Sequence, residues 1–243
     1  MHVMITGASK GIGLAIAKRF VRDTHVNLSL CARRESALSE AHRTIVKEFP
    51  TVSLYAAVCD VSLEQDVNRF VIEAEQNFGP VDILVNNAGF GLFKAVGEIT
   101  TKEFDNVLAT NLRGVFLVTQ AVLPGMKACK SGTIISISSL AGRNGFAGGA
   151  AYCASKFGVR GLMQSLFLEV RDFDIRVITI FPGSVDTDFF DIAGHPLGSQ
   201  AKNVLRAEDV AASVYAAAML PSGATISELD IRPTNPNRQM SKP

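Results

Sequence analysis

Thr6-Gly7-Ala8-Ser9-Lys10-Gly11-Ile12-Gly13 is the stretch of sequence that decides the fold. It follows a short apolar run and opens an amphipathic stretch that is typical of a helix. Glycines let the backbone turn tightly beside a pyrophosphate, and a helix N-terminus offers free N–H groups and the positive end of its dipole. The order of strand, glycine loop and helix therefore predicts a dinucleotide site and not an ordinary glycine-rich turn. The loop residues that we expect to bind the cofactor are Gly7, Ser9, Lys10, Gly11, Ile12 and Gly13.

Short apolar runs alternate with amphipathic stretches along the rest of the chain. The predicted strands are Val3–Thr6, Val26–Ala32, Ser53–Val58, Ile83–Asn86, Thr133–Ile137, Arg176–Phe181 and Ile226–Ile231. The predicted helices are Gly11–Arg22, Glu35–Glu48, Leu63–Phe78, Thr101–Lys127, Ala150–Asp172 and Ala207–Leu220. Runs that are rich in Val, Ile and Leu are typical of strands buried on both faces of a parallel sheet. The alternation predicts an α/β protein: a single-domain Rossmann fold over residues 1–243, with a doubly wound seven-stranded parallel sheet flanked by helices on both faces.

Two helix starts carry a recognisable capping pattern, and two segments do not look regular. Ser62 with Gln65 and Thr100 with Glu103 each match a capping box. Residues 188–205 contain several glycine and proline residues and predict a mobile connection, which we expect to act as a lid over the substrate. Residues 233–243, with three prolines, predict an irregular C-terminal tail.

Composition narrows the classes of function and compartment. The net charge of +1 implies neither a nucleic-acid partner nor an acidic substrate. The four cysteines show no C-x-x-C spacing, which indicates thiols in a reducing compartment and no metal site. The glycine loop begins too early for a signal peptide, and no apolar run approaches the roughly 20 residues that span a bilayer. We therefore expect a soluble, cytoplasmic protein without a membrane partner.

Tyr152 and Lys156 are the leading candidates for catalysis. Their separation of four residues places both side chains on one face of a predicted helix. A free tyrosine has a pKa of about 10, which is high for proton exchange at neutral pH. A nearby ammonium and a positive nicotinamide ring favour the phenolate, so we expect them to lower the pKa of Tyr152. Such a pair is common on exposed helices, and its meaning depends on the motifs around it.

Those motifs resemble the short-chain dehydrogenase/reductase family over nearly the whole chain. The resemblance is carried by the Gly-x-x-x-Gly-x-Gly spacing of residues 7–13, by Asn86-Asn87-Ala88-Gly89, and by Tyr152-Cys153-Ala154-Ser155-Lys156. It implies that Asp60 and Val61 meet the adenine, and that Asn87, Ala88 and Gly89 lie beside its ribose. It also implies a loop that holds the nicotinamide carboxamide, formed by Pro182, Gly183, Val185 and Thr187.

The resemblance also assigns the catalytic roles. Ser139, thirteen positions before the tyrosine, is selected over Ser138 to orient the substrate oxygen. Asn111 would hold a water that links Lys156 to solvent. Lys156 would bind the nicotinamide ribose and tune Tyr152, and both side chains are therefore also cofactor contacts.

The charges after the second predicted strand indicate which cofactor is bound. A carboxylate there would accept hydrogen bonds from a ribose 2′-OH and repel a 2′-phosphate. This chain has Ala32 followed by Arg33 and Arg34, and Lys10 lies in the glycine loop. Cations without a carboxylate suit a 2′-phosphate, so we predict NADP(H).

We expect an NADPH-dependent reductase of a ketone or other carbonyl compound. The side chains placed to choose it are apolar or aromatic, which favours a flat or hydrophobic small molecule; they are Phe90, Leu92, Phe93, Phe146, Phe189 and Phe190. Asp186, Asp188 and Asp191 are expected to face water, with a basic or amine-bearing ligand as the alternative. The Arg232-Pro233-Thr234 ending resembles that of bacterial sepiapterin-type reductases and of assorted carbonyl reductases. A sepiapterin-type reductase would act on a ketone on the side chain of a pteridine.

Reduction of a 3-oxoacyl group on an acyl-carrier protein is the alternative activity. A basic patch would then dock the acidic carrier, and its candidates are Arg113, Lys127, Lys130, Arg143 and Arg160. A nucleotide-sensing regulator and a sugar-nucleotide epimerase fit less well, because Tyr152 and Lys156 are intact and 243 residues leave no separate substrate domain. The resemblance implies a homodimer, with a homotetramer as the alternative.

Overall fold

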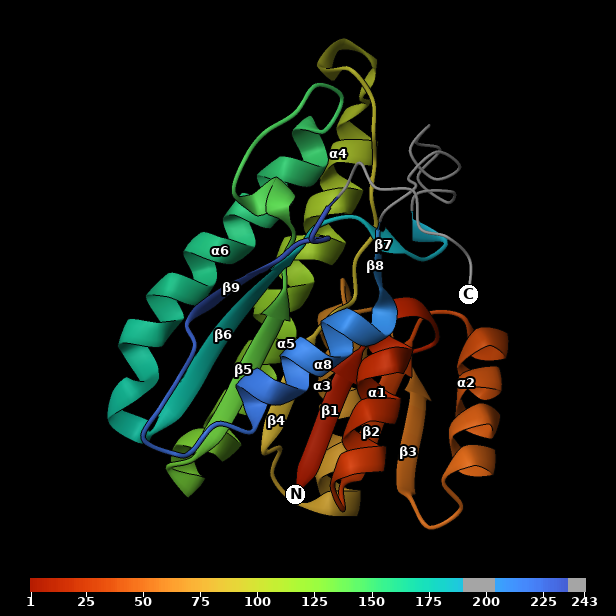
Figure 1. The fold of residues 1–243 in the computed structure, drawn as a ribbon, viewed down its shortest axis with the longest axis vertical. Helices are drawn as coiled ribbons and strands as arrows, with labels where there is room; N and C mark the ends of the chain where they lie inside the picture. Colours follow the sequence, from red (N-terminus) through yellow and green to blue (C-terminus); the bar gives the residue numbers. More distant parts are fainter. Residues whose placement is uncertain (190–203, 236–243) are drawn as a thin grey trace.

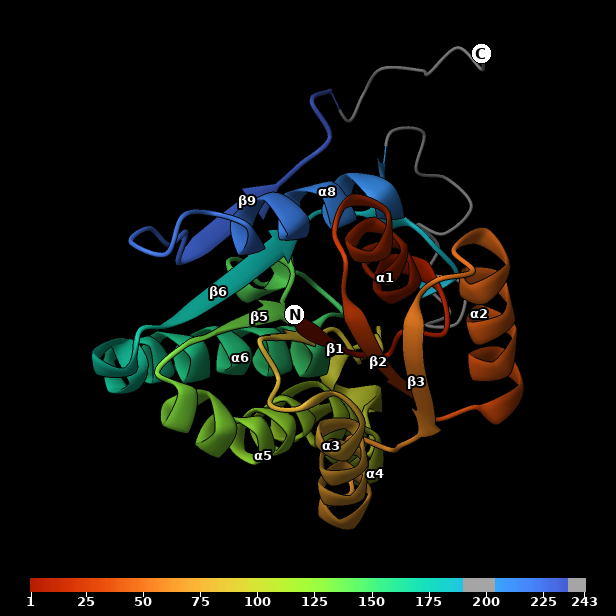
Figure 2. The ribbon, with the colours of Figure 1, turned by 90° about the horizontal axis from the view of Figure 1, so that it is seen from below.

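A computed structural model describes residues 1–189 and 204–235 of the chain, and its centre is one parallel sheet (Figures 1 and 2). Its strands are β1 (His2–Thr6), β2 (Asn27–Ala32), β3 (Ser53–Val58), β4 (Ile83–Asn86), β5 (Gly132–Ile137), β6 (Ile175–Pro182) and β9 (Glu228–Ile231). They lie in the order β3-β2-β1-β4-β5-β6-β9, and every neighbouring pair is parallel. The predicted seven-stranded parallel sheet is confirmed.

Helices cover both faces of this sheet, as the alternating pattern predicts (Figure 2). One face carries α1 (Gly11–Asp23), α2 (Glu35–Glu48) and α8 (Ala207–Ala218). The other carries α3 (Glu64–Phe78), α4 (Thr101–Leu108), α5 (Gly114–Cys129) and α6 (Ala150–Val170). Short helical turns complete the chain: η1 (Val96–Glu98), η2 (Ala109–Arg113), η3 (Leu140–Gly142) and η4 (Arg171–Phe173).

Alternation along each strand explains why both of its faces are apolar. In β1, Val3 and Ile5 pack with the helices of the first face, whereas Met4 points into the second cluster. The same division separates Val85 from Leu84 in β4. Neighbouring side chains of a strand point to opposite faces, so a sheet covered on both sides needs apolar residues at every position.

The order of strands places a crevice at one end of the sheet. The chain moves outward from β1 through β2 to β3, and then returns to the other side of β1 with β4. The loops after β1 and β4 therefore diverge at the carboxyl ends of these strands, where ligands bind in open α/β sheets.

The two predicted capping boxes have different outcomes. At α4 the amide of Glu103 donates to Thr100 Oγ1 at 3.2 Å, and the amide of Thr100 donates back to Glu103 Oε2 at 3.0 Å, which confirms that box. At α3 the prediction is wrong: Leu63 is the N-cap, and no side chain caps the helix. The Ser62 hydroxyl donates instead to Asp60 Oδ1 at 2.7 Å. A side chain of this kind can bond a neighbouring group in place of capping the helix, and the carboxylate of Asp60 lies only two residues away.

The helix predicted over Thr101–Lys127 is interrupted by a π-helical turn at η2 and ends at Cys129. Its whole span, Thr101–Cys129, is long and apolar enough to cross a membrane by length and composition, so the prediction that no segment approaches that limit is wrong. Half of its most apolar window is buried inside the fold, where α5 packs against α3, β4 and β5. A helix in the core of an α/β protein is as apolar as this span, so its composition does not by itself indicate a membrane.

The connection between β6 and α8 contains a small parallel pair that the sequence pattern did not predict. Val185 in β7 (Val185–Asp186) pairs with Leu205 in β8 (Leu205–Arg206). This pair lies at both ends of the predicted lid. Residues 190–203 of that lid, which include Phe190 and Asp191, lie outside the described residues, as do residues 236–243 of the predicted tail.

Two helical glycines give a matched test of the packing around the loop. A Cβ on Gly13 would lie 2.5 Å from Asn87 Nδ2 and from the Gly7 carbonyl oxygen, whereas one on Gly161 would meet nothing within 4 Å. We expect Gly161→Ala to stabilise the protein by about 0.5–1 kcal/mol, because alanine loses less backbone entropy in a helix. Gly13→Ala should destabilise it by roughly 1–3 kcal/mol through overpacking. Thermal unfolding measures both, and equal shifts in Tm would contradict the close packing at Gly13.

Candidate active site

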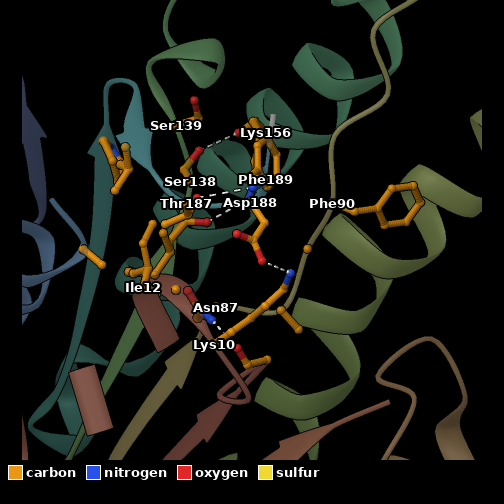
Figure 3. Close-up of a pocket in the computed structure, with 18 of the residues that line it drawn as sticks. Lys10, Ile12, Asn87, Phe90, Ser138, Ser139, Lys156, Thr187, Asp188 and Phe189 are labelled. Atoms are coloured by element: carbon orange, nitrogen blue, oxygen red, sulfur yellow. Dashed lines mark hydrogen bonds and ion pairs between the residues drawn. The ribbon is translucent and has the colours of Figure 1, made fainter. Parts of the chain in front are cut away.

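A cleft of about 1280 Å³ opens at the carboxyl ends of β1, β4 and β5 (Figure 3). Its volume exceeds the roughly 300–1,000 Å³ that holds a drug-sized ligand, so it has room for a dinucleotide and a second small molecule. Most of the residues predicted from the sequence line it: Gly7, Ser9, Lys10, Gly11, Ile12, Arg33, Arg34, Val61, Asn87, Ala88, Gly89, Ser139, Tyr152, Lys156, Pro182, Gly183, Val185 and Thr187. Gly13, Asp60 and Asn111 are not part of the lining.

The glycine loop is held against the chain that follows β4. Gly7 has a φ of +65°, and a Cβ there would lie 2.7 Å from the Ala88 Cα atom. The Asn87 side-chain amide donates to the carbonyl oxygens of Thr6 and Gly7, both at 3.0 Å. These contacts show that Asn87 supports the loop from behind, and Gly13, packed on the same amide, does so as well.

The N-terminus of α1 fits a pyrophosphate. Its N-cap, Lys10, forms no side-chain capping hydrogen bond, which leaves the N–H groups of the first turn for a ligand. Gly11 has a φ of +55°, and a Cβ there would lie 3.3 Å from Thr187 Cγ2. The loop after β6 therefore approaches the glycine loop closely.

The wall that was predicted to meet the adenine differs in part from the prediction. Val61 and the neighbouring Cys59 line the wall. Asp60 instead accepts hydrogen bonds from the Ser62 amide at 2.9 Å and from the Ser62 hydroxyl. Its carboxylate is thus occupied in shaping the turn before α3, which accounts for its absence from the cleft lining.

The predicted cations, Arg33 and Arg34 after β2 and Lys10 in the glycine loop, all line the cleft, and Lys10 has a partner that the sequence pattern missed. Lys10 Nζ lies 2.6 Å from Asp188 Oδ2 (Figure 3). The Arg33 guanidinium lies 5.9 Å from the centre of the Phe90 ring. The hydrogen bond from Lys10 and the charges of Lys10 and Arg34 lower the pKa of Asp188. The expectation that Asp188 faces only water is therefore wrong, although its side chain is 68% exposed and that of Lys10 is 40% exposed.

Tyr152 and Lys156 are both buried in the cleft wall, and burial controls their protonation. Burial raises the pKa of Tyr152 to about 12, although the hydrogen bond with Ser139 opposes this shift. Burial also lowers the pKa of Lys156 to about 8. Lys156 Nζ donates to the Ile137 carbonyl oxygen at 2.8 Å and lies 5.8 Å from the Tyr152 ring centre. In the protein without its cofactor, burial therefore raises the pKa of Tyr152, and the lowering expected from the ammonium together with a bound nicotinamide ring stays a prediction.

The two serines after β5 have different partners. Ser138 Oγ donates to the Lys156 carbonyl oxygen at 3.2 Å and so ties β5 to α6 (Figure 3). Ser139 Oγ accepts from the Ala141 amide at 3.1 Å and is the serine that bonds Tyr152. This geometry favours Ser139 as the residue that would contact a substrate oxygen beside the phenol.

Asn111 lies in the π-helical turn η2 and bridges two segments of the site. Its Oδ1 accepts from the Phe90 amide at 3.0 Å, and its Nδ2 donates to the Phe90 carbonyl oxygen at 2.8 Å and to Ser155 Oγ at 3.1 Å. Single π turns often occur at functional sites, because they turn one side chain out of the helical register. Here the turn directs Asn111 at the loop after β4, and the water relay stays a prediction.

Aromatic rings surround Tyr152 on the substrate side of the cleft. The centre of the Tyr152 ring lies 5.6 Å from those of Phe93 and Phe189, and Phe146 lies 5.9 Å from Phe93. Two glycines make room for these rings: a Cβ on Gly91 would lie 2.8 Å from Phe93, and one on Gly149 would lie 2.5 Å from Phe146. We call Phe93, Phe146 and Phe189 the aromatic wall.

Some lining residues were not found from the sequence. They are side chains that only the tertiary structure brings to the cleft: Asn144, Gly145, Ala207 and Glu208 among them. Asn144 follows η3, and Ala207 begins α8, which packs beside α1. Asn144 and Ala207 belong to no recognisable motif. The one sequence signal for Asn144 and Gly145 as lining residues is that they lie between Ser139 and Tyr152.

Comparison with known proteins agrees with this geometry. The sequence profile of short chain dehydrogenases matches residues 1–195. Sepiapterin reductase of Chlorobaculum tepidum is 35% identical over 239 residues, 96% of either chain. A putative ketoacyl reductase of the granaticin polyketide synthase from Streptomyces violaceoruber is 41% identical over 76% of this chain and 67% of its own. The crystal structure of a metagenomic short-chain oxidoreductase in complex with NADP superposes with a TM-score of 0.83 and is 35% identical over 97% of each chain. This chain belongs to the short-chain dehydrogenase family of oxidoreductases.

Proposed function

We propose that this chain reduces a carbonyl compound with NADPH, and that Tyr152 donates the proton. The observation that carries the proposal is the buried phenol beside Ser139 in the cleft wall, with a pKa raised to about 12. A phenol with that pKa is protonated at neutral pH, which is the form needed to give a proton to a developing alkoxide. The resting protein therefore holds Tyr152 in the form that a reduction requires.

The cofactor is NADP(H). The uncapped N-terminus of α1 and the glycine loop suit its pyrophosphate, and Lys10, Arg33 and Arg34 suit its 2′-phosphate. The bound cofactor supplies a hydride to the carbonyl carbon. An exposed ion pair such as that of Lys10 with Asp188 is easily exchanged for a phosphate, because water screens it.

The remaining steps belong to side chains of this chain. Ser139 orients the carbonyl oxygen and stabilises the charge that develops there. Tyr152 Oη donates the proton that completes the alcohol. Lys156, held by the Ile137 carbonyl oxygen, binds the nicotinamide ribose, and its ammonium stabilises the phenolate left after the transfer.

The substrate is a flat or hydrophobic small carbonyl compound, such as a ketone on a pteridine side chain. The aromatic wall supports this proposal, because rings at 5.6–5.9 Å from one another present faces and edges on which a planar group can pack. The similarity to a sepiapterin reductase over 96% of the chain also supports it.

A 3-oxoacyl group on a carrier protein is the second candidate, favoured by the ketoacyl reductase relative. The basic patch expected for it is less available than the sequence indicates. Arg143 and Arg160 both pair with Glu228, and Arg113 donates to the Ser62 carbonyl oxygen at 2.7 Å. These contacts favour a free small molecule.

Two further expectations stay predictions. The four free cysteines suit the reducing cytoplasm. A homodimer would cover exposed rings on α4, α5 and α6, which are those of Phe104, Phe116 and Phe157.

An NADPH-oxidation assay tests the activity and the substrate class together. The panel contains pteridine ketones, diketones, quinones and acetoacetyl thioesters. We expect turnover of planar ketones, and Tyr152→Phe should lower kcat by at least about 100-fold, as loss of a general acid does. Binding of NADPH by that variant, followed by fluorescence, should remain close to that of the wild type. Retained turnover by Tyr152→Phe refutes its role, and preference for thioesters selects the second candidate.

A charge placed at the end of β2 tests the cofactor. Ala32→Asp introduces a carboxylate near the proposed 2′-phosphate, and like charges 4 Å apart repel by about 4 kcal/mol at an effective dielectric constant of 20. We expect kcat/KM for NADPH to fall at least about tenfold, while that for NADH does not fall. Ala32→Ser, which is similar in size and uncharged, is the matched control and should keep the preference for NADPH. A wild-type preference for NADH would contradict the assignment.

The pKa of Tyr152 is directly measurable, because the chain contains only three tyrosines. In protein labelled with ¹³C at the tyrosine Cζ, we expect the Tyr152 resonance to be less than half titrated at pH 11, because burial raises its pKa to about 12. Tyr152→Phe assigns the resonance. Ser139→Ala should move the midpoint further up, since the bond with Ser139 lowers the pKa. A midpoint at or below 10 would show that burial does not control the phenol.

A further inference from the structure

An ion cluster beside the site connects the loop of Ser139 to the last strand. The Arg143 guanidinium contacts both carboxylates of β9: one nitrogen bonds Glu228 Oε2, and another lies 3.0 Å from Asp230 Oδ1. Its Cζ lies 3.8 Å from the centre of the Phe181 ring. The side chains of Arg143 and Glu228 are only 19% and 21% exposed, so water screens the pair less than it screens a surface pair.

Glu228 also holds the helix that carries Tyr152 and Lys156. Arg160 Nε donates to Glu228 Oε1 at 3.0 Å, and Gln164 Nε2 donates to the same oxygen at 2.8 Å. Arg160 lies one turn beyond Lys156 on α6. One carboxylate therefore binds the loop after Ser139 and the helix of Tyr152 at the same time.

The backbone around Arg143 transmits its position to Ser139. The Arg143 amide donates to the Leu140 carbonyl oxygen at 2.9 Å, which closes η3, and Ser139 is the N-cap of that turn. Phe181, beneath the guanidinium, directly precedes Pro182 and Gly183 of the cleft wall. A shift of Arg143 would therefore move both the Ser139 turn and its support on β6.

We propose that Arg143 is a positioning residue, which acts through Glu228 to hold Ser139 in register with Tyr152. This inference rests on the proposed reductase activity. The guanidinium itself contacts Glu228, Asp230 and Phe181 and no catalytic side chain, so its effect on the reaction is indirect. The lowered pKa of Glu228, caused by Arg160, Arg143 and Gln164 against the effect of burial, agrees with a carboxylate that stays charged in the cluster.

Arg176, on the same strand as Phe181, provides a matched control for Arg143. It is also a half-buried arginine, and it donates to Thr133 Oγ1 at 2.8 Å and to the Ala218 carbonyl oxygen at 2.7 Å. It lies at the start of β6, whereas Phe181 and the Arg143 cluster lie at the end that forms the cleft. Removing either arginine should lower Tm, but only Arg143 is connected to Ser139.

The test compares Arg143→Met, Arg143→Lys, Glu228→Gln and Arg176→Met, with kcat expressed per folded, NADPH-binding molecule. We expect Arg143→Met to lower kcat by about 10- to 100-fold, the effect of a misplacement near 1 Å, with KM for NADPH unchanged. Glu228→Gln should have a smaller effect in the same direction, and Arg143→Lys should restore part of the activity. The primary isotope effect with deuterated NADPH should rise in Arg143→Met, because hydride transfer becomes slower than product release. Arg176→Met should change only Tm.

The ¹³C resonance of Tyr152 gives a second readout that needs no turnover. Loss of Arg143 should move this resonance, because the bond with Ser139 changes, whereas Arg176→Met should leave it in place. Equal kcat values for Arg143→Met and Arg176→Met, or an unmoved Tyr152 resonance, would overturn the proposal. If the wild type reduces no compound of the panel, the proposed function fails, and the resonance alone then decides the role of Arg143.

Discussion

The close approach between the glycine loop and the chain after β4 constrains the whole active end of the molecule. Gly7 lies against the Ala88 backbone and Gly13 against the Asn87 amide, with no space for a Cβ at either position. The Asn87 side chain then fixes two loop carbonyl groups. A side chain larger than hydrogen at Gly7 or Gly13 would therefore push the glycine loop away from the chain after β4.

At the opposite wall of the cleft, desolvation affects the pKa of Tyr152 more than the charge of Lys156 does. Tyr152 and Lys156 share one helical face, but the ammonium is directed at the Ile137 carbonyl oxygen, and each group is stabilised in its neutral form. Burial disfavours the charged form of both groups, but with a pKa of about 8 Lys156 keeps its ammonium at neutral pH, while Tyr152 stays a neutral phenol. In the protein without its cofactor, the Tyr152 phenol is therefore protonated at neutral pH.

The sequence predicted those parts of the structure that depend on local patterns. All seven strands were found within two residues of their ends, because a sheet covered on both faces requires continuous apolar runs. The box at Thr100 was found because its partners are three residues apart. The same rule failed at Ser62, where the carboxylate of Asp60 competes for the hydroxyl. A π turn leaves no mark in apolar periodicity, and η2 was therefore missed.

The candidate site divides in the same way. Gly7, Ser139, Tyr152 and Lys156 belong to motifs, and the structure brings them to one cleft. The position of the Asp60 carboxylate and the contact of Lys10 with Asp188 could not be predicted. Asp60 depends on the turn before α3, and Asp188 is 178 residues from Lys10, so that only the folded chain brings the two together.

The position of β9 also has a consequence for the order in which the molecule is made. Arg143 and Glu228 are separated by 85 residues, and the strand that carries Glu228 is the last one added to the edge of the sheet. During synthesis, the glycine loop, β4 and α6 all emerge before the carboxylate that joins the Ser139 turn to α6. A nascent chain therefore contains its nucleotide-binding half before its catalytic geometry is complete, and closing such a long loop is the entropically costly step.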